Sequence, residues 1–169
     1  MRFLLVLVLV FATVQANSAA GLSAADEAAL VQTATRLRDA VVAKDMDGFL
    51  ELVAESGLGC TDAEYSRDKV EADLRSPNGY LHRGLFDTSR FAAECEHAYT
   101  TTYPWISDRD FFLADAGVTI EVTSISENLA QVTFRSKVAG HYPREYEFRK
   151  EHGSWRLVYG VIVGGCSCG

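Results

Sequence analysis

The sequence predicts an α+β domain, with N-terminal helices packed on a curved, four-stranded antiparallel sheet at the C-terminal end. Two observations support this fold class. Between residues 23 and 56 apolar residues recur at helical spacing, whereas after Gly117 apolar and polar residues alternate with a period of two. Because the helical pattern ends before the strand pattern begins, helices and strands should form separate layers.

The first helix should begin at Ser23, whose hydroxyl can accept a hydrogen bond from a free backbone N–H of the first turn. A helix of about 20 residues is indicated, because apolar residues recur at the helical period. Its apolar face consists of Leu30, Ala34, Leu37 and Val41. Residues 44–48 break this pattern, and Phe49 should begin a second, shorter helix that ends near Gly57. The two helices should form a hairpin.

The middle of the chain, residues 60–112, has a less regular pattern. Residues 66–74 and 87–98 predict two short helices, and the sequence Pro-Asn-Gly at 77–79 predicts a turn between them. Residues 99–112 are too apolar for a disordered linker, so we expect them to pack over the core as a covering segment. Its large aromatic residues are Tyr99, Tyr103, Trp105, Phe111 and Phe112.

The C-terminal part of the chain should form the sheet. Apolar and polar residues alternate over four segments, 118–123, 132–138, 145–149 and 155–163. Short turn sequences separate them at 126–128, 139–140 and 151–153. Turns of this length join neighbouring antiparallel strands, so a four-stranded meander is expected.

The first sixteen residues, Met1–Ala16, have the pattern of a secretory signal peptide. Arg2 is followed by the apolar run Phe3–Phe11 and by Val14-Gln15-Ala16, a small-residue cleavage pattern. This run is too short to span a bilayer, which takes about 20 residues. We therefore expect a single domain over residues 17–169 that is exported to the periplasm or secreted, with no stable membrane insertion after the signal is cleaved.

The charge of the chain argues against nucleic acids as partners. It carries 23 acidic and 16 basic residues, for a net charge of −7. Phosphate backbones and anionic membrane surfaces are bound through an excess of basic residues. We therefore expect no nucleic-acid partner.

Four cysteines, Cys60, Cys95, Cys166 and Cys168, fit an exported protein with disulfide bonds. Four cysteines allow three pairings. We favour a bond between Cys60 and Cys95, with Cys166 and Cys168 pairing with each other or with a partner chain; free or redox-active thiols are the alternative. The spacing does not match a typical zinc site, and we expect no metal or cofactor.

Two segments resemble the nuclear transport factor 2-like superfamily. Residues 37–50 are similar to its first helix, acidic break and second helix, and residues 146–158 are similar to its final hairpin. The resemblance implies a cone-shaped α+β fold, which hosts polyketide-cyclase-like and ketosteroid-isomerase-like enzymes as well as carriers and interaction modules. Residues 60–112 depart from the family pattern. Enzymes of the superfamily place an acid or a histidine inside the cone, and no such motif can be matched here, so we assign no catalytic residue.

The candidate ligand-binding residues are aromatic side chains and one arginine. Alternation places Arg144 on the same face as Tyr142 and Tyr146, where it could clamp a ligand carboxylate or pair with an internal acid. Alternatively, Arg144 could extend to solvent. Tyr103 and Trp105 could line an apolar pocket or a partner surface, or pack in the core.

A general acid–base pair is conceivable between His97 and Asp108 or Asp110. No sequence argument shows that these side chains meet. A histidine at a helix end, and a turn capped by Ser107 and Asp108, are the simpler interpretation.

The expected function is that of an exported, non-catalytic binding or protein-interaction domain. Its partner would be another protein or a small apolar ligand. One alternative is a small-molecule enzyme of the polyketide-cyclase or ketosteroid-isomerase type, which would need an ionisable group with a perturbed pKa inside a pocket. Another is a structural envelope protein that forms a homodimer through an apolar sheet face.

Overall fold

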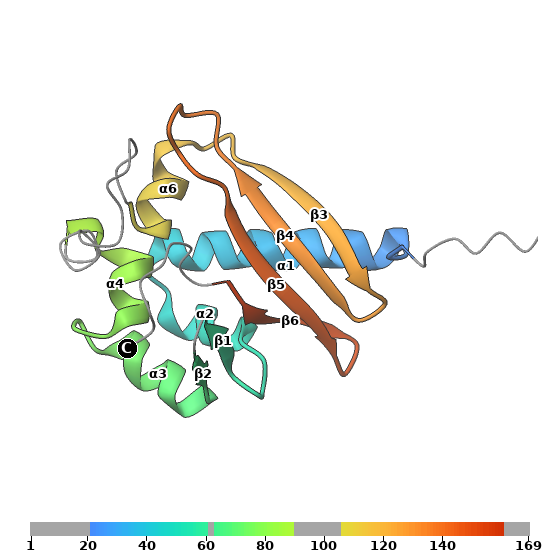
Figure 1. Ribbon diagram of the computed structural model, residues 1–169, viewed down its shortest axis with the longest axis horizontal. Helices are drawn as coiled ribbons and strands as arrows, with labels where there is room; N and C mark the ends of the chain where they lie inside the picture. The colour runs from blue at the N-terminus through green and yellow to red at the C-terminus, as the bar shows by residue number, and fades with distance from the viewer. Residues whose placement is uncertain (1–20, 61–62, 90–105, 161–169) are drawn as a thin grey trace, which may run out of the picture.

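The structure is a computed structural model that describes residues 21–60, 63–89 and 106–160. Among these residues the helices come first, with one short β-hairpin between them, and the longer strands follow one another toward the C-terminal end (Figure 1). The described elements are α1 (Ala24–Ala43), α2 (Met46–Leu52), β1 (Leu58–Cys60), β2 (Ala63–Tyr65), α3 (Arg67–Arg75), α4 (Tyr80–Phe86), α6 (Asp108–Ala114), β3 (Thr119–Ser126), β4 (Leu129–Arg135), β5 (Arg144–Glu151) and β6 (Ser154–Tyr159).

The first helical hairpin follows the prediction, except at the start of its second helix. Ser23 caps α1, and its hydroxyl oxygen accepts from the N–H of Asp26 at 3.1 Å. Helix α2 begins at Met46 rather than at Phe49, because the Asp45 carboxylate accepts from the N–H of Gly48 at 2.9 Å and caps the helix earlier. Helix α2 also ends earlier than predicted, at Leu52.

Within the described residues the sheet has six strands, so the prediction of four was incomplete. Their order is β2-β1-β6-β5-β4-β3, and every neighbouring pair is antiparallel except β1 and β6. The additional strands, β1 and β2, have three residues each, too few for an alternating pattern to be recognised. Gly57 precedes them with φ +97°, and a Cβ there would lie 1.8 Å from the Tyr65 carbonyl oxygen. Glycine is therefore required for the hairpin to close in this way.

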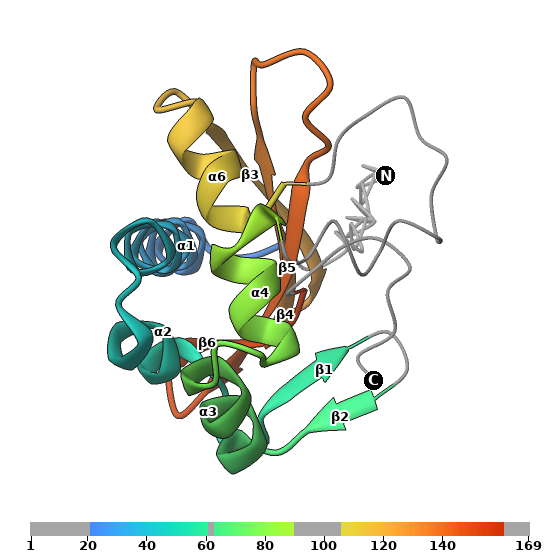
Figure 2. The same ribbon diagram turned by 90° about the vertical axis from the view of Figure 1, so that its left-hand side faces the viewer.

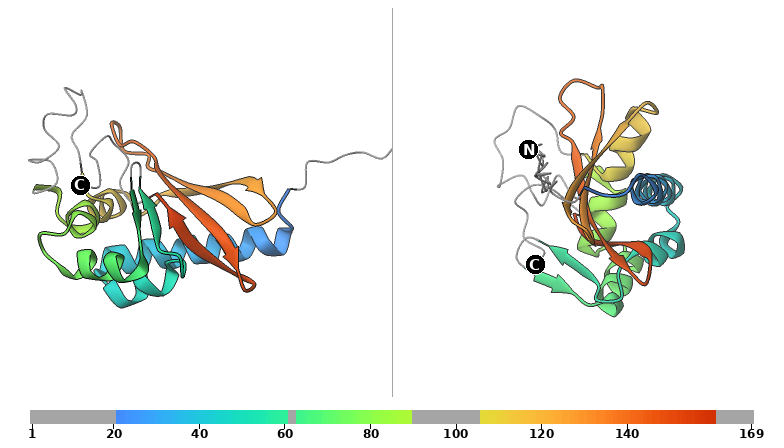
Figure 3. Two further views of the ribbon diagram at one scale, coloured as in Figure 1. Left: turned by 60° about the horizontal axis from the view of Figure 1, so that its bottom comes forward. Right: turned by 90° about the vertical axis from the view of Figure 1, so that its right-hand side faces the viewer.

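The helices cover one face of the sheet. Figure 2 shows α1, α2 and α6 on the same side, and α1 contacts both β3 and β6. The views in Figure 3 show the twist of the sheet, with the β1–β2 hairpin turned away from β3. The alternation predicted for the strands is confirmed on the helix-covered face. Its fully buried residues are Ala130, Val132, Phe134, Tyr146, Phe148 and Leu157.

The middle of the chain is more helical than predicted. Helix α3 lies where expected, but the prediction missed helix α4. The Asp73 carboxylate caps α4 by accepting hydrogen bonds from the N–H of Tyr80 at 3.2 Å and from the N–H of Leu81 at 2.6 Å. The predicted helix over 87–98 falls largely outside the described residues. In the segment expected to cover the core, Ser107 caps a helix, α6, because its hydroxyl accepts from the N–H of Asp110 at 3.2 Å.

Several predictions concern residues that the structure does not describe. The proposed signal peptide, residues 1–16, and three of the four cysteines, Cys95, Cys166 and Cys168, belong to this group. The proposed export and the disulfide pairing therefore stay predictions. Among the described helices, none combines the length and the hydropathy that crossing a membrane requires.

Candidate functional site

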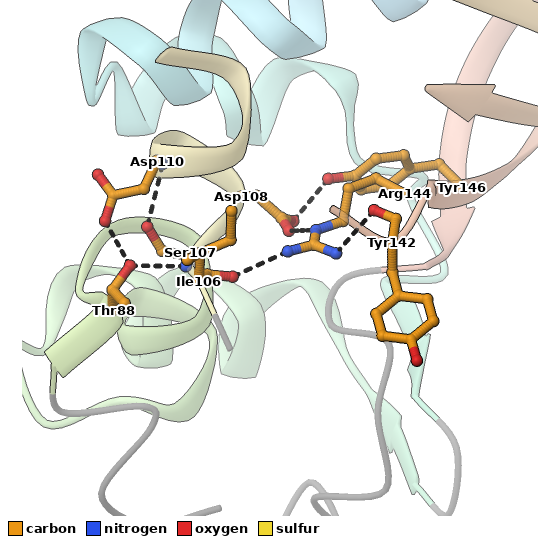
Figure 4. Close-up of polar contacts among 8 residues, drawn as sticks. All are labelled: Thr88, Ile106, Ser107, Asp108, Asp110, Tyr142, Arg144 and Tyr146. Atoms are coloured by element: carbon orange, nitrogen blue, oxygen red, sulfur yellow. Dashed lines mark hydrogen bonds and ion pairs between the residues drawn. The ribbon is translucent and has the colours of Figure 1, made fainter. Parts of the chain in front are cut away.

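A buried ion pair joins the start of α6 to the start of β5. Asp108 is the first residue of α6 and Arg144 the first residue of β5. The Arg144 Nε donates to Asp108 Oδ1 at 2.7 Å, and the two residues are 5% and 2% exposed. Figure 4 shows both side chains pointing toward each other. The interpretation that Arg144 pairs with an internal acid is the one that the structure supports.

Every other polar group of this cluster also has a partner within it. The Tyr146 hydroxyl donates to the second carboxylate oxygen of Asp108 at 2.5 Å. Arg144 donates from Nη2 to the Ile106 carbonyl oxygen at 2.8 Å and from Nη1 to the Tyr142 carbonyl oxygen at 3.3 Å. Its guanidinium carbon lies 4.8 Å from the centre of the Phe111 ring, a cation–π contact. The cluster is therefore internally satisfied.

Burial raises the pKa values of both acids in the cluster. Removal from water raises the pKa of the Asp108 carboxyl, although the nearby Arg144 charge and the Tyr146 hydroxyl act in the opposite direction. Burial also raises the pKa of the Tyr146 hydroxyl well above its ordinary value, and the negative charge of Asp108 adds to this increase. Tyr146 therefore remains protonated at neutral pH and can donate to the carboxylate.

A second group of contacts holds α6 from its other side. Thr88 donates its hydroxyl to Asp110 and accepts from the Ser107 N–H at 2.7 Å. Arg109 Nε donates to the Val42 carbonyl oxygen at 3.1 Å, which connects α6 to the last turn of α1. Helix α6 is thus fixed to α1, to residue 88 and to β5.

The structure places the predicted site residues in two different environments. Arg144 and Tyr146 are buried in the cluster, whereas Tyr142 is 53% exposed, and its ring points away from the cluster (Figure 4). Tyr103 and Trp105 lie outside the described residues. The proposed pairing of His97 with Asp108 or Asp110 is not tested for the same reason, but Asp108 has Arg144 and Tyr146 as its partners.

Sequence reasoning did not identify Asp108 as the partner of Arg144. The pattern Ser-x-x-Asp at residues 107–110 is a helix-start signal that would have located α6. It carries no information about which strand the helix contacts. The two residues are 36 positions apart, and only the tertiary fold brings them together.

Two of the cavities that described residues line lie away from the cluster. The larger, of about 690 Å³, lies beside α2 and the β5–β6 turn. Its acidic residues are Glu51, Glu55 and Glu151, its arginines are Arg36, Arg67 and Arg156, and His152 also contributes to the lining. Arg67 already donates to the carbonyl oxygens of Val53 and Leu50, at 2.7 and 2.8 Å. Acidic and basic groups are equally present, so this groove favours no ligand charge.

The smaller cavity, of about 280 Å³, lies where β1 adjoins β6, and Glu64, Glu147, Arg149 and Tyr159 contribute to its lining. Within the part of the chain that the structure describes, no three His, Cys, Asp or Glu side chains are grouped as a metal site would require. The cluster of Asp108, Arg144 and Tyr146 is therefore the most distinctive polar feature of the described residues.

Comparisons with known proteins give similarities at the level of fold. No protein-family model and no curated protein sequence matches the chain. A protein of unknown function with a cystatin-like fold from Nostoc punctiforme has a TM-score of 0.41 at 15% identity, covering 86% of this chain and 96% of its own. A putative dehydratase from the NTF2-like family of Streptomyces avermitilis has a TM-score of 0.38 at 11% identity, covering 80% and 93%.

An NTF2-like protein with a cystatin-like fold from Novosphingobium aromaticivorans has a TM-score of 0.36 at 15% identity, covering 85% of this chain and 90% of its own. At these TM-scores and identities, no function and no residue role passes from these proteins to this chain. Two of these proteins are described as NTF2-like, and the resemblance of this chain to that superfamily stays the expectation drawn from residues 37–50 and 146–158.

Proposed function

We propose that the protein is an exported, non-catalytic domain that binds another protein through a surface centred on Tyr142. The observation that carries this proposal is the double role of Tyr142. Its backbone carbonyl accepts from the buried Arg144, and its ring is 53% exposed. A backbone tied to the buried cluster therefore carries an aromatic side chain that is largely exposed.

Such an arrangement suits protein recognition. Tyrosine is enriched among residues that dominate binding energy, since its ring buries a large area and its hydroxyl can still form a hydrogen bond. A side chain on an ordered backbone loses less conformational entropy on binding than one on a loose loop. Arg144 supplies that order, because one guanidinium holds both the Tyr142 and the Ile106 carbonyl oxygens.

The partner is proposed to be a protein rather than an enclosed small ligand. Tyr142 lines neither of the two cavities described above. The segment before β5 also exposes Val138, at 39%. An aromatic and an aliphatic side chain exposed on one segment give a partner apolar area without a pocket.

The test is site-specific photo-crosslinking in the organism that makes the protein. A photoreactive phenylalanine analogue at position 142 should give one adduct of defined mass. The same analogue at Leu113, which is 51% exposed on α6, is the matched control and should not. Once the adduct identifies the partner, its affinity for purified Tyr142→Ala should be lower by roughly 30-fold or more, whereas Tyr142→Phe should retain most of it. Equal adducts at 142 and 113, or none at 142, would overturn the proposal.

A catalytic function is the second candidate, and one observation favours it. Asp108 and Tyr146 both have raised pKa values and share one cluster, an arrangement often found in active sites. Both carboxylate oxygens of Asp108 already accept hydrogen bonds, and neither of the two cavities described above reaches them. Native and denaturing mass spectra separate the candidates. A small mass retained only under native conditions would favour the enzyme, and a protein-sized one the binding domain.

The geometry gives less support to a structural protein that dimerises through an apolar sheet face. The described residues on the face opposite the helices include Glu121, Arg135, Glu145 and Arg149, all of them exposed. A face of this composition resembles ordinary solvated surface.

A further inference from the structure

The smaller cavity lies on the face of the sheet that the helices leave open, and one row of paired residues crosses it. Glu64 on β2 pairs with Gly59 on β1. Gly59 also pairs with Tyr159 on β6, and Tyr159 pairs with Glu147 on β5. All four residues line the cavity. Because residues opposite each other on paired strands point to the same face, the register brings two carboxylates and a tyrosine ring together on that face.

Glycine and a β-bulge shape this part of the sheet. A Cβ at Gly59 would lie 3.0 Å from Tyr159 Cδ2, so glycine allows the Tyr159 ring to lie against the backbone of β1. The ring remains 38% exposed. The pairing of β5 with β6 shifts between Glu147 and Phe148, which leaves Val158 without a partner on β5. Bulges of this kind redirect side chains and are frequent beside binding sites.

The two carboxylates of the cavity are not neutralised by the residues that the structure describes. Neither Glu64 nor Glu147 has a side-chain hydrogen bond or an ion pair among those residues. Arg149 also lines the cavity, but its Nη1 lies 3.9 Å from Oε1 of Glu151 on its own strand. The charged lining therefore consists of two acids and one arginine that has another acid beside it.

We propose that this cavity binds an organic ammonium group, either of a small free amine or of a lysine side chain. The carboxylates of Glu64 and Glu147 would accept hydrogen bonds from the ammonium, and the Tyr159 ring would attract its charge. A hard metal ion fits less well, because it requires about six oxygen ligands and the cavity supplies two carboxylates and an aromatic ring. Tyr142 does not line this cavity, so the inference is independent of the function proposed above.

Titration of the purified protein with butylammonium chloride, followed by two-dimensional NMR of the backbone amides, tests the proposal. The Gly59 and Tyr159 amides should show saturable shifts with a Kd of roughly 1–10 mM, the affinity of a small ligand held by a few polar contacts. Butan-1-ol, which has the same carbon chain without the charge, should give none. A short peptide with a single lysine, compared with its Nε-acetylated form, separates the two sources: tighter binding of the unmodified peptide than of butylammonium indicates a protein partner, and the reverse indicates a free amine.

Three substitutions assign the binding to the named side chains. Glu147→Gln should raise the Kd for butylammonium by roughly 3- to 10-fold, and Tyr159→Leu by roughly 2- to 5-fold, whereas Tyr159→Phe keeps the ring and should keep the affinity. Glu145→Gln is the matched control, because Glu145 is exposed on the same strand and face but does not line the cavity. The absence of saturable shifts, equal shifts with butan-1-ol, or an equal effect of Glu145→Gln and Glu147→Gln would each overturn the proposal.

Discussion

Replacing Arg144 with methionine tests whether the buried cluster holds the fold together. The substitution keeps most of the side-chain volume but removes the charge, and it leaves the Asp108 carboxyl with Tyr146 as its remaining partner. It also removes the two hydrogen bonds to the Ile106 and Tyr142 carbonyl oxygens. Breaking a buried ion pair by removing one partner costs about 3–5 kcal/mol of unfolding free energy, a large part of the stability of a domain of this size.

A second substitution separates the charge from the hydrogen bonds. Without Arg144, whose charge is the main influence lowering the Asp108 pKa, that carboxyl must take up a proton or remain as an unpaired buried charge. Asp108→Asn removes this requirement. We therefore expect the double variant to be more stable than Arg144→Met by about 1–2 kcal/mol. Asp108→Asn alone leaves the buried Arg144 charge facing an amide oxygen that can still accept its hydrogen bond, and burial already raises the pKa of Asp108, so this variant should cost less than Arg144→Met.

Urea unfolding followed by far-ultraviolet circular dichroism measures these free energies. An exposed ion pair serves as the control: Arg135 and Glu121 are 2.7 Å apart, with side chains 52% and 53% exposed, so Arg135→Met should cost less than about 1 kcal/mol. If Arg144→Met cost no more than this control, the cluster would not be a buried support. If Asp108→Asn cost as much as Arg144→Met, the argument from the raised pKa of Asp108 would be wrong.

Four further predictions address acid stability, the N-terminal segment and the disulfide pairing. Hydrogen bonds from backbone N–H groups lower the pKa of the Asp115 carboxyl. The contribution of Asp115 to the free energy of unfolding is therefore present above pH 3.8 and is lost as the pH falls through the lowered pKa. Asp115→Asn should flatten the decrease in stability at acid pH. The pH dependence of the Asp108 contribution has the opposite sign. This contribution to stability is complete below pH 3.8 and is lost as the pH rises through the raised pKa of Asp108. Comparing the unfolding free energies of Asp108→Asn and wild type across this pH range measures it. If residues 1–16 are a signal peptide, N-terminal sequencing of the exported protein should begin at or near residue 17. Peptide mapping without reductant should link Cys60 to Cys95, and separate unlinked peptides would contradict that pairing.

Local patterns predicted much of the fold because they depend on neighbouring residues. The cap at Ser23 and the alternation of residues in β4 and β5 are examples that the structure confirms. The β1–β2 hairpin was missed because three-residue strands have no measurable period. Helix α4 was missed because its cap, Asp73, lies in the preceding helix rather than at the helix start.

The candidate site was only partly predictable, for a different reason. Alternation placed Arg144 on the buried face, next to Tyr146, from the sequence alone. Its partner could not be chosen, because many acidic residues were compatible and no local pattern relates α6 to β5. The exposure of Tyr142 was also missed, since the alternation was extended past the start of β5 into residues that are not in a strand.

The packing of α1 has a consequence for when the protein can fold. The helix is among the first elements to be synthesised, yet it packs against β6, which is among the last. Asp26, in its first turn, pairs with Lys150 of β5 at 2.5 Å across 124 positions of the chain. Folding must therefore wait until nearly the whole chain has left the ribosome, and contacts of such long sequence separation form slowly. A chain that stays unfolded during its synthesis can still be threaded through a narrow export channel, which suits the leader-like sequence at its N terminus.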